Sequence, residues 1–328
     1  MTKTAVFLFN LGGPDAPEAV EPFLFNLFND PAIIGAPGPI RWLIARLISK
    51  RRAPIAREIY AQIGGRSPLV PETEAQARAL EAALGPDFRC FIAMRYWHPF
   101  CHEAIAAAKA WGAERAVLLP LYPQFSTTTT GSSVKQFRHE AKAAGFNVAV
   151  ETICCWPTEP GLVAAVSELV QAGIGRAGQG ARVLFSAHGL PKKVVERGDP
   201  YQAQVELTAA AVAAACGLQD WVVCYQSRVG PLEWIGPSTE AELERAGRDR
   251  VPVVVVPIAF VSEHSETLVE LDIEYRHRAE QLGVPAYVRV AAVGCHPAFI
   301  DGLAGLVRIP APGSACGRLG RSCPGKGM

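Results

Sequence analysis

The stretch Val251–Glu274, VPVVVVPIAFVSEHSETLVELDIE, decides how this chain folds. Its first half is a β-branched apolar run of strand length, and its second half carries acids at helical spacing. This order predicts a buried parallel strand that passes through a short turn into a helix. Ligands in open α/β sheets collect at the carboxyl ends of the strands, which is where the acidic turn would lie. The stretch therefore predicts an α/β fold with a functional site at this turn.

A row of acids continues from the turn, which itself contains Glu263, His264 and Glu266. Glu266, Glu270 and Glu274 follow one another at intervals of four and would share one face of an α-helix. The opposite face would carry Leu268, Leu271 and Tyr275. The row has two interpretations, a solvated helix face or a set of groups that binds a cation or passes protons, because carboxylates and imidazoles do both.

Seven further runs of strand length, each followed by a turn and a helical stretch, occur along the chain. Such alternation predicts parallel sheets flanked by helices. The expected strands are Ala5–Asn10, Cys90–Tyr96, Ala116–Leu121, Asn147–Ile153, Val183–Ser186, Trp221–Gln226, Val251–Phe260 and Ala286–Val293.

The two halves of the chain resemble each other in pattern. The turn Asn10–Pro14 corresponds to Ala187–Pro191, and the fourth expected strands end alike in Cys-Trp-Pro157 and Cys-His-Pro297. We therefore expect two similar α/β lobes, each with a four-stranded parallel sheet, over residues 1–158 and 159–309, with a ligand cleft between them. Residues 310–328 form a cysteine-containing tail.

Composition limits the class of protein. The chain has 328 residues, 49% of them hydrophobic and 19% charged, with a formal net charge of +1. These values describe a globular protein with a large interior and argue against general nucleic-acid binding. The sequence has no apolar run of transmembrane length and no export signal after Lys3, so we expect a cytoplasmic protein.

The segment from Phe23 to Arg52 interrupts the strand–helix alternation. It is rich in Phe, Leu and Ile, and it ends in Lys50, Arg51 and Arg52. The segment is either ordinary core or an apolar lip, with basic residues at its edge, over a hydrophobic ligand or a membrane surface.

Eight motifs, in order along the chain, now identify a family. They are Asn10-Leu-Gly-Gly-Pro14, Ile63-Gly-Gly-Arg-Ser-Pro68, Arg95-Tyr-Trp-His-Pro99, Tyr122-Pro-Gln-Phe-Ser126 with Thr130-Gly-Ser-Ser133, Ser186-Ala-His-Gly-Leu-Pro191, Gly198-Asp-Pro-Tyr201, Gln226-Ser-Arg-Val-Gly-Pro231 with Trp234, and Ser265-Glu-Thr-Leu-Val-Glu-Leu-Asp272. Together they resemble ferrochelatase from Thr4 to about Val307.

The resemblance implies two Rossmann-like lobes around a porphyrin cleft and insertion of ferrous iron into protoporphyrin IX, the terminal step of haem synthesis. It assigns the catalytic roles and contact with the metal to His188 and Glu266, on facing walls. Glu263, His264, Glu270 and Glu274 would form a proton or metal path. The porphyrin contacts that it implies are Leu11, Arg52, Tyr60, Ser67, Arg95, Tyr96, Tyr201 and Trp234, with Arg52 and Ser67 holding propionates.

The reaction explains the residue types. A free-base porphyrin is flat and holds two N–H protons, so the ring must bend and lose both before a metal enters. Imidazole titrates near neutrality and is the natural proton acceptor. The alternatives left open are a coproporphyrin ferrochelatase, a cobalt or nickel chelatase, and a non-catalytic haem carrier. The protein would be a monomer or homodimer, with possible peripheral contact to a membrane.

Some members of the family carry a [2Fe–2S] cluster, and this tail offers Cys316 and Cys323. Such clusters usually take four thiolates. Cys295 is the first choice to complete a set, because it precedes the last expected helix, and Cys155 at the matching strand end of the other lobe is the second.

Overall fold

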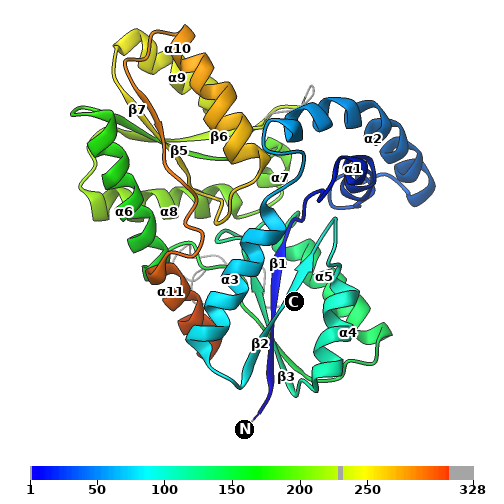
Figure 1. The fold of residues 1–328 in the computed structure, drawn as a ribbon. Helices are drawn as coiled ribbons and strands as arrows, with labels where there is room; N and C mark the ends of the chain where they lie inside the picture. The colour runs from blue at the N-terminus through cyan, green and yellow to red at the C-terminus, as the bar shows by residue number, and fades with distance from the viewer. Residues whose placement is uncertain (1, 228–231, 310–328) are drawn as a thin grey trace. The chain divides into compact units, whose positions relative to one another are not determined.

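The computed structural model describes residues 2–227 and 232–309 and contains two four-stranded parallel sheets flanked by helices (Figure 1). The first sheet has the order β2-β1-β3-β4, and the second has the order β6-β5-β7-β8. Both place their first strand in sequence inside the sheet, between the second and the third. The expected α/β fold of two similar four-stranded sheets is confirmed.

The strands of the first sheet are β1 (Thr4–Asn10), β2 (Phe88–Met94), β3 (Arg115–Pro120) and β4 (Ala149–Thr152). Those of the second are β5 (Arg182–His188), β6 (Trp221–Gln226), β7 (Val253–Pro257) and β8 (Tyr287–Arg289). Strand β8 is shorter than the sequence suggests because its only ladder, with β7, runs from Val253↔Tyr287 to Val255↔Arg289. Every strand overlaps the run of residues that was expected to form it.

The chain forms two compact units, each with one sheet. The first comprises residues 2–122, Ser126–Cys155 and the end of helix α11 (Pro297–Arg308) from Leu303. The second comprises Pro123–Phe125 and Trp156–Gly302.

Alternation along β1 builds the core of the first unit. Ala5, Phe7 and Phe9 face one side of the sheet and pack against α4 (Cys101–Trp111) and α5 (Thr130–Ala143). The Phe7 ring lies 4.7 Å from the ring of Phe137, edge to face. Successive strand residues point to opposite faces, so the other β1 side chains face the side covered by α3 (Leu69–Leu84) (Figure 1).

The second unit has helices on both faces of its sheet (Figure 1). One face contacts α6 (Pro160–Ala177) and α8 (Tyr201–Cys216), and the other contacts α9 (Thr239–Asp249) and α10 (Tyr275–Gln281). The strand side chains on the second face, including Leu184 and Val255, are fully buried beneath Leu243 and Leu271. The remaining elements are the short α7 (Lys192–Glu196), a π-helix η2 (Glu266–Glu274) and α11 (Pro297–Arg308).

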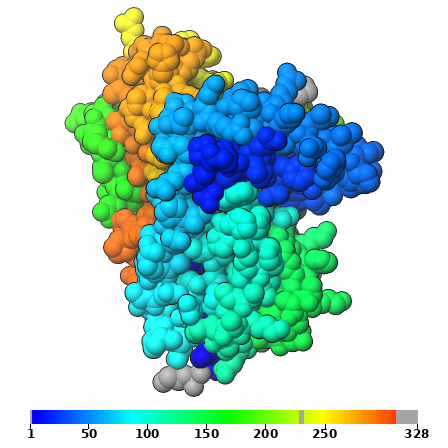
Figure 2. All heavy atoms as spheres, turned by 45° about the vertical axis from the view of Figure 1, so that its right-hand side comes forward, coloured from blue at the N-terminus to red at the C-terminus, as the bar shows by residue number. Residues whose placement is uncertain are grey.

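The segment Phe23–Arg52 forms parts of two packed helices, α1 (Val20–Phe28) and α2 (Gly38–Ala61), after a short 3-10 turn, Pro17–Ala19. Phe23 and Leu24 are buried, so this half of the segment is core. Ile40, Leu43 and Leu47 recur at helical spacing on α2 and are 54–63% exposed. Figure 2 shows α1 and α2, in blue, at the molecular surface. The core interpretation thus holds for the α1 part of the segment, and the lip interpretation stays a prediction for the exposed side chains of α2.

The described part of the chain contains no helix that is long and apolar enough to span a bilayer.

Candidate functional site

His188 is the last residue of β5, which is an inner strand of the second sheet. It therefore lies at the carboxyl end of a parallel sheet, where open α/β folds place ligands. Its Nδ1 is 2.9 Å from Oε2 of Glu266. The Tyr201 hydroxyl donates to the backbone carbonyl of His188, and Gly189 N donates to the carbonyl of Gln226. The imidazole and the backbone that carries it are both held in place.

Glu266 begins η2, and this segment corrects the expected α-helix. In a π-helix the hydrogen bonds run from i to i+5, so residues five apart become neighbours. Tyr275, expected on the face opposite the acids, instead donates from its hydroxyl to Oε1 of Glu270 at 3.2 Å. The row of acids also ends early, since Glu266 and Glu270 are half-buried whereas Glu274 is exposed.

Glu270 has donors on both carboxylate oxygens. Oε1 accepts from Ser227 N at 2.8 Å as well as from Tyr275, and Oε2 accepts from Gln226 Nε2 at 3.0 Å and Ser227 Oγ at 2.5 Å. Ser227 has a φ of 61°, a left-handed conformation that non-glycine residues adopt rarely. Strained backbone of this kind persists where the surroundings fix it, which is common at functional sites.

The charges of this cluster are coupled. Burial lowers the pKa of His188, but the charge and hydrogen bond of Glu266, with the charge of Glu270, outweigh it, and the pKa of His188 is raised. Burial raises the pKa of Glu266, and the two histidines reverse that effect and bring it down to about 2. The pKa of Glu270 is raised, first by burial and then by Glu266. Glu266 is thus an ionised carboxylate near neutral pH, and it favours the protonated form of His188.

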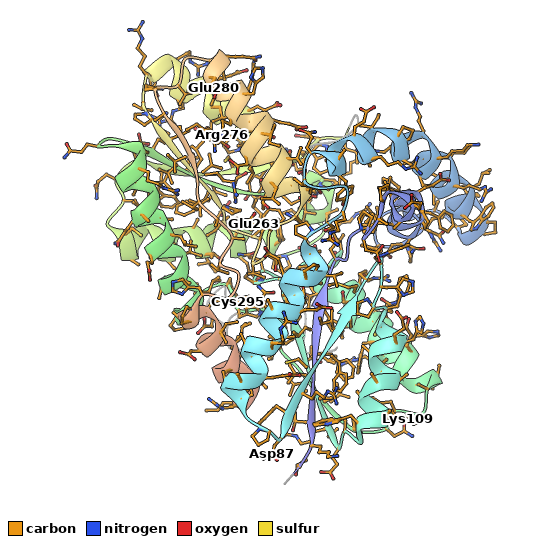
Figure 3. The ribbon with its side chains drawn as sticks, in the orientation of Figure 1. Asp87, Lys109, Glu263, Arg276, Glu280 and Cys295 are labelled. Carbon is orange, nitrogen blue, oxygen red and sulfur yellow. The ribbon has the colours of Figure 1, made fainter. Side chains whose placement is uncertain are left out.

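His264 and Glu263 belong to the same turn but have different surroundings. His264 is buried, and burial lowers its pKa, so it stays neutral 3.9 Å from the carboxylate of Glu266. Glu263 forms an ion pair with Arg289 at 2.7 Å, and it also accepts from Ala292 N at 3.0 Å. Figure 3 labels Glu263 at the start of this segment and Arg276 farther along it. Glu263 is therefore held by a guanidinium and a backbone N–H, whereas the partner of Glu266 is an imidazole.

Six of the eight predicted porphyrin contacts lie in the first unit, and three of them, Tyr60, Ser67 and Tyr96, are buried. Leu11, Tyr60 and Tyr96 belong to one apolar cluster with side chains of α1 and α2. Ser67 is buried, and its hydroxyl accepts from Leu69 N at the start of α3. The residues of the set that are not buried are Leu11, Arg52, Arg95 and Trp234, of which Arg52 is exposed and the others are partly buried.

The cysteine predictions divide between described and undescribed parts of the chain. Cys155 is buried and Cys295 is exposed, on the segment that leads into α11 (Figure 3). Cys316 and Cys323 lie outside the described residues. Within residues 2–227 and 232–309, no three His, Cys, Asp or Glu side chains gather as a metal-binding group.

The sequence analysis assigned no site role to three residues that contact Glu270, namely Gln226, Ser227 and Tyr275. The first two stand in the motif at the end of β6, but their contact with Glu270 crosses 44 and 43 positions of the chain. The contact of Tyr275 with Glu270 follows from the five-residue spacing of a π-helix. No local residue preference predicts that spacing. All three act by holding one carboxylate.

The pair predicts how His188 titrates. Replacing Glu266 with Gln removes the charge that raises the pKa of His188 and leaves the burial that lowers it, so the pKa should fall. Histidine ¹⁵N shifts followed against pH measure this directly, with Glu274→Gln as an exposed control from the same helix that should change little. An unchanged His188 pKa in Glu266→Gln would show that the two groups are not coupled.

Comparison with known proteins identifies the family. The ferrochelatase family model matches residues 3–309. Among curated proteins, the ferrochelatase of Caulobacter vibrioides is 57% identical, with 98% of this chain and 94% of that protein covered. That of Phenylobacterium zucineum is 56% identical over 92% of this chain and 90% of its own length. The solved structure of SirB from Bacillus subtilis with Fe3+ has the same fold, with a TM-score of 0.59, 14% identity, and 96% and 97% of the two chains covered. The chain belongs to the ferrochelatase family.

Proposed function

We propose that this protein is an enzyme, a metal-inserting lyase, that places ferrous iron in protoporphyrin IX and forms protohaem, the terminal step of haem synthesis. The observation that carries the proposal is the His188–Glu266 pair, at 2.9 Å, at the carboxyl end of a central strand in a chain of the ferrochelatase family. The curated relatives are named ferrochelatase, which favours iron over cobalt or nickel and an enzyme over a haem carrier.

The histidine is suited to remove the porphyrin protons. Glu266 engages Nδ1 of His188, so Nε2 is the nitrogen that would receive a pyrrole proton. It can do so only while His188 is neutral, and the raised pKa of His188 moves the neutral form to higher pH. Each metal insertion releases two protons, and the entering Fe2+ replaces their charge, so the product is neutral at the ring.

The carboxylates of Glu266, Glu270 and Glu274 would each have a different role in moving these protons. Glu266, with a pKa of about 2, stays ionised and stabilises the imidazolium that forms. Glu270, whose pKa is raised by burial and by Glu266, is the better proton acceptor of the two. A proton passed from His188 toward Glu270 would restore the neutral imidazole for the second pyrrole proton. Glu274, exposed at the end of η2, would release protons to water or admit iron.

Binding energy from the ring faces would supply the bending that exposes the nitrogen lone pairs. Contacts remote from the reacting atoms commonly stabilise a strained substrate by several kcal/mol. Tyr201, whose hydroxyl is fixed on the His188 carbonyl, and the partly buried Trp234 are candidates for such contacts in the second unit. Arg52 is exposed on α2 and would pair with a propionate, since guanidinium and carboxylate form strong bidentate hydrogen bonds.

A single assay tests the proposal. The purified protein is incubated anaerobically with protoporphyrin or coproporphyrin and with Fe2+, Co2+ or Ni2+, and metalloporphyrin formation is followed by absorbance. We expect iron and protoporphyrin to be preferred. His188→Ala should reduce insertion by about 10²–10⁴-fold, as is usual for loss of a general base, while porphyrin binding persists.

Other variants sharpen this assay. Glu266→Gln should impair insertion nearly as much as His188→Ala, and Glu270→Gln should do so less. The exposed His277→Ala is the matched control and should insert iron at the unmodified rate. Wild-type turnover by His188→Ala would overturn the catalytic assignment, and equal losses at Glu266, Glu270 and Glu274 would favour a general electrostatic effect.

The exposed apolar side chains of α2, Ile40, Leu43 and Leu47, support a second proposal. This helix admits the porphyrin to its site and contacts a membrane surface. Phe25 and Trp42 stack edge to face at 6.2 Å, and Lys50 to Arg52 follow on the same helix as Trp42. Basic residues beside an apolar surface suit anionic headgroups. Replacing Phe25, Phe28 and Trp42 with Ser should raise the KM for protoporphyrin and weaken sedimentation with anionic liposomes. If the triple variant instead unfolds, these side chains are core.

A [2Fe–2S] cluster in the tail is a separate proposal. Thiolates hold such clusters, and the described residues would contribute Cys295, which is exposed, or Cys155, which is buried. These side chains do not form a ligand set without Cys316 and Cys323. Anaerobically purified protein should then absorb in the visible range and contain iron and sulfide, and Cys323→Ser should lose both. A colourless protein free of iron and sulfide would contradict the cluster.

A further inference from the structure

A buried carboxylate organises the connection between α1 and α2. The side chain of Asp30 is 2% exposed, and its Oδ2 lies 2.7 Å from Nη2 of Arg95. The same oxygen accepts from the Tyr96 hydroxyl at 2.8 Å and from Ser132 Oγ at 3.2 Å. Its Oδ1 accepts from Ala32 N at 2.8 Å, within the connection itself. Buried charges need such complete pairing.

Arg95 is occupied by protein acceptors on all three guanidinium nitrogens. Besides Nη2 on Asp30, its Nε donates to Ser132 Oγ at 2.7 Å and its Nη1 donates to Gln136 Oε1 at 2.8 Å. Asp30 also neutralises its charge, and its side chain is only 18% exposed. A guanidinium in this state is poorly suited to bind a second carboxylate.

These contacts join three parts of the first unit. Asp30 follows α1, Arg95 and Tyr96 follow β2, and Ser132 and Gln136 lie on α5. A second link is parallel, because Asn26 Nδ2 donates to the carbonyl of Tyr96 at 3.1 Å. The helix pair that carries Arg52 and the exposed Ile40, Leu43 and Leu47 is thereby attached to the end of the sheet through a buried ion pair and this second hydrogen bond.

We infer that Asp30 and Arg95 are positioning residues, which fix the α1–α2 pair against the sheet, and that Arg95 does not itself recognise a porphyrin carboxylate. The inference rests on the proposed function, because it assumes that this face receives the porphyrin. It revises the role that the resemblance implies for Arg95. Tyr96 is buried and donates to the same carboxylate of Asp30. Burial and then the charge of Asp30 raise the pKa of Tyr96, so its hydroxyl keeps the proton that it donates.

The test separates carboxylate recognition from positioning by using two metal-free probes, protoporphyrin IX and its dimethyl ester, dispersed in the same detergent. Fluorescence titration gives a Kd for each, and the ratio of ester to acid measures recognition of the carboxylates. Arg52→Gln should bring this ratio toward one. Arg95→Gln and Asp30→Asn should weaken both probes by the same factor, about tenfold, and leave the ratio unchanged.

Two further measurements and two further variants make the result decisive. Amide hydrogen exchange over residues 26–52 should become faster in Asp30→Asn, and KM for iron insertion should rise more than kcat falls. Tyr96→Phe removes one hydrogen bond from Asp30 but keeps both charges, so it should show the same changes, reduced, even if Arg95→Gln does not fold. Lys135→Gln, exposed on α5, is the control and should change none of them.

A ratio that falls in Arg95→Gln as it does in Arg52→Gln would overturn the inference, as would unchanged exchange in Asp30→Asn. Neither result would touch the proposed function, because iron insertion by the unmodified protein would stand. Failure of the unmodified protein to bind either probe would reject the proposed function instead.

Discussion

The hydrogen bond between His188 Nδ1 and Glu266 Oε2 is the interaction on which the site depends. It connects the end of an inner strand to the start of a π-helix, and it sets the charge of both groups. Glu266 is the largest influence that raises the pKa of His188 against burial, and His188 is the largest influence that lowers the pKa of Glu266 against burial. Each group therefore favours the charged form of the other.

The rest of the second unit holds this pair and its neighbour Glu270. A π-helix is rare and occurs often at functional sites, because its wider turn brings residues five apart together. Here the wider turn brings Tyr275 to Glu270, while Ser227, in a strained conformation, supplies two more donors from the end of β6. Donors favour the ionised carboxylate and burial opposes it. Burial prevails and raises the pKa of Glu270, so Glu270 takes a proton more readily than Glu266 does.

The sequence predicts the parts of this arrangement that depend on local pattern. The run Val253–Pro257 and the corresponding runs in both halves predict the sheets, because parallel strands buried on both faces are continuously apolar. The positions of His188 at a strand end and of Glu266 at the start of the next helix follow from the same alternation.

Interactions that join distant segments were not predictable in this way. Residues Glu266–Glu274 form a π-helix instead of the expected α-helix, and no local residue pattern indicates this. The predicted orientation of Tyr275 was therefore wrong. The Asp30–Arg95 pair joins residues far apart along the chain, and an arginine in a motif gives no sign of which acceptor it will meet. Arg52, Tyr60 and Ser67 are all predicted porphyrin contacts. No motif indicates that Arg52 is exposed whereas Tyr60 and Ser67 are buried.

The central claim is that Glu266 sets the protonation of His188 and thereby the pH at which iron is inserted. The most direct test is the pH dependence of kcat/KM for iron insertion, which reports the pKa values of the free enzyme. Because neutral His188 is required and its pKa is raised, the unmodified enzyme should lose activity on the acid side at a pH above the usual histidine pKa. The slower Glu266→Gln enzyme should keep its remaining activity to a lower pH. Acid limbs that coincide in the two enzymes would contradict the account.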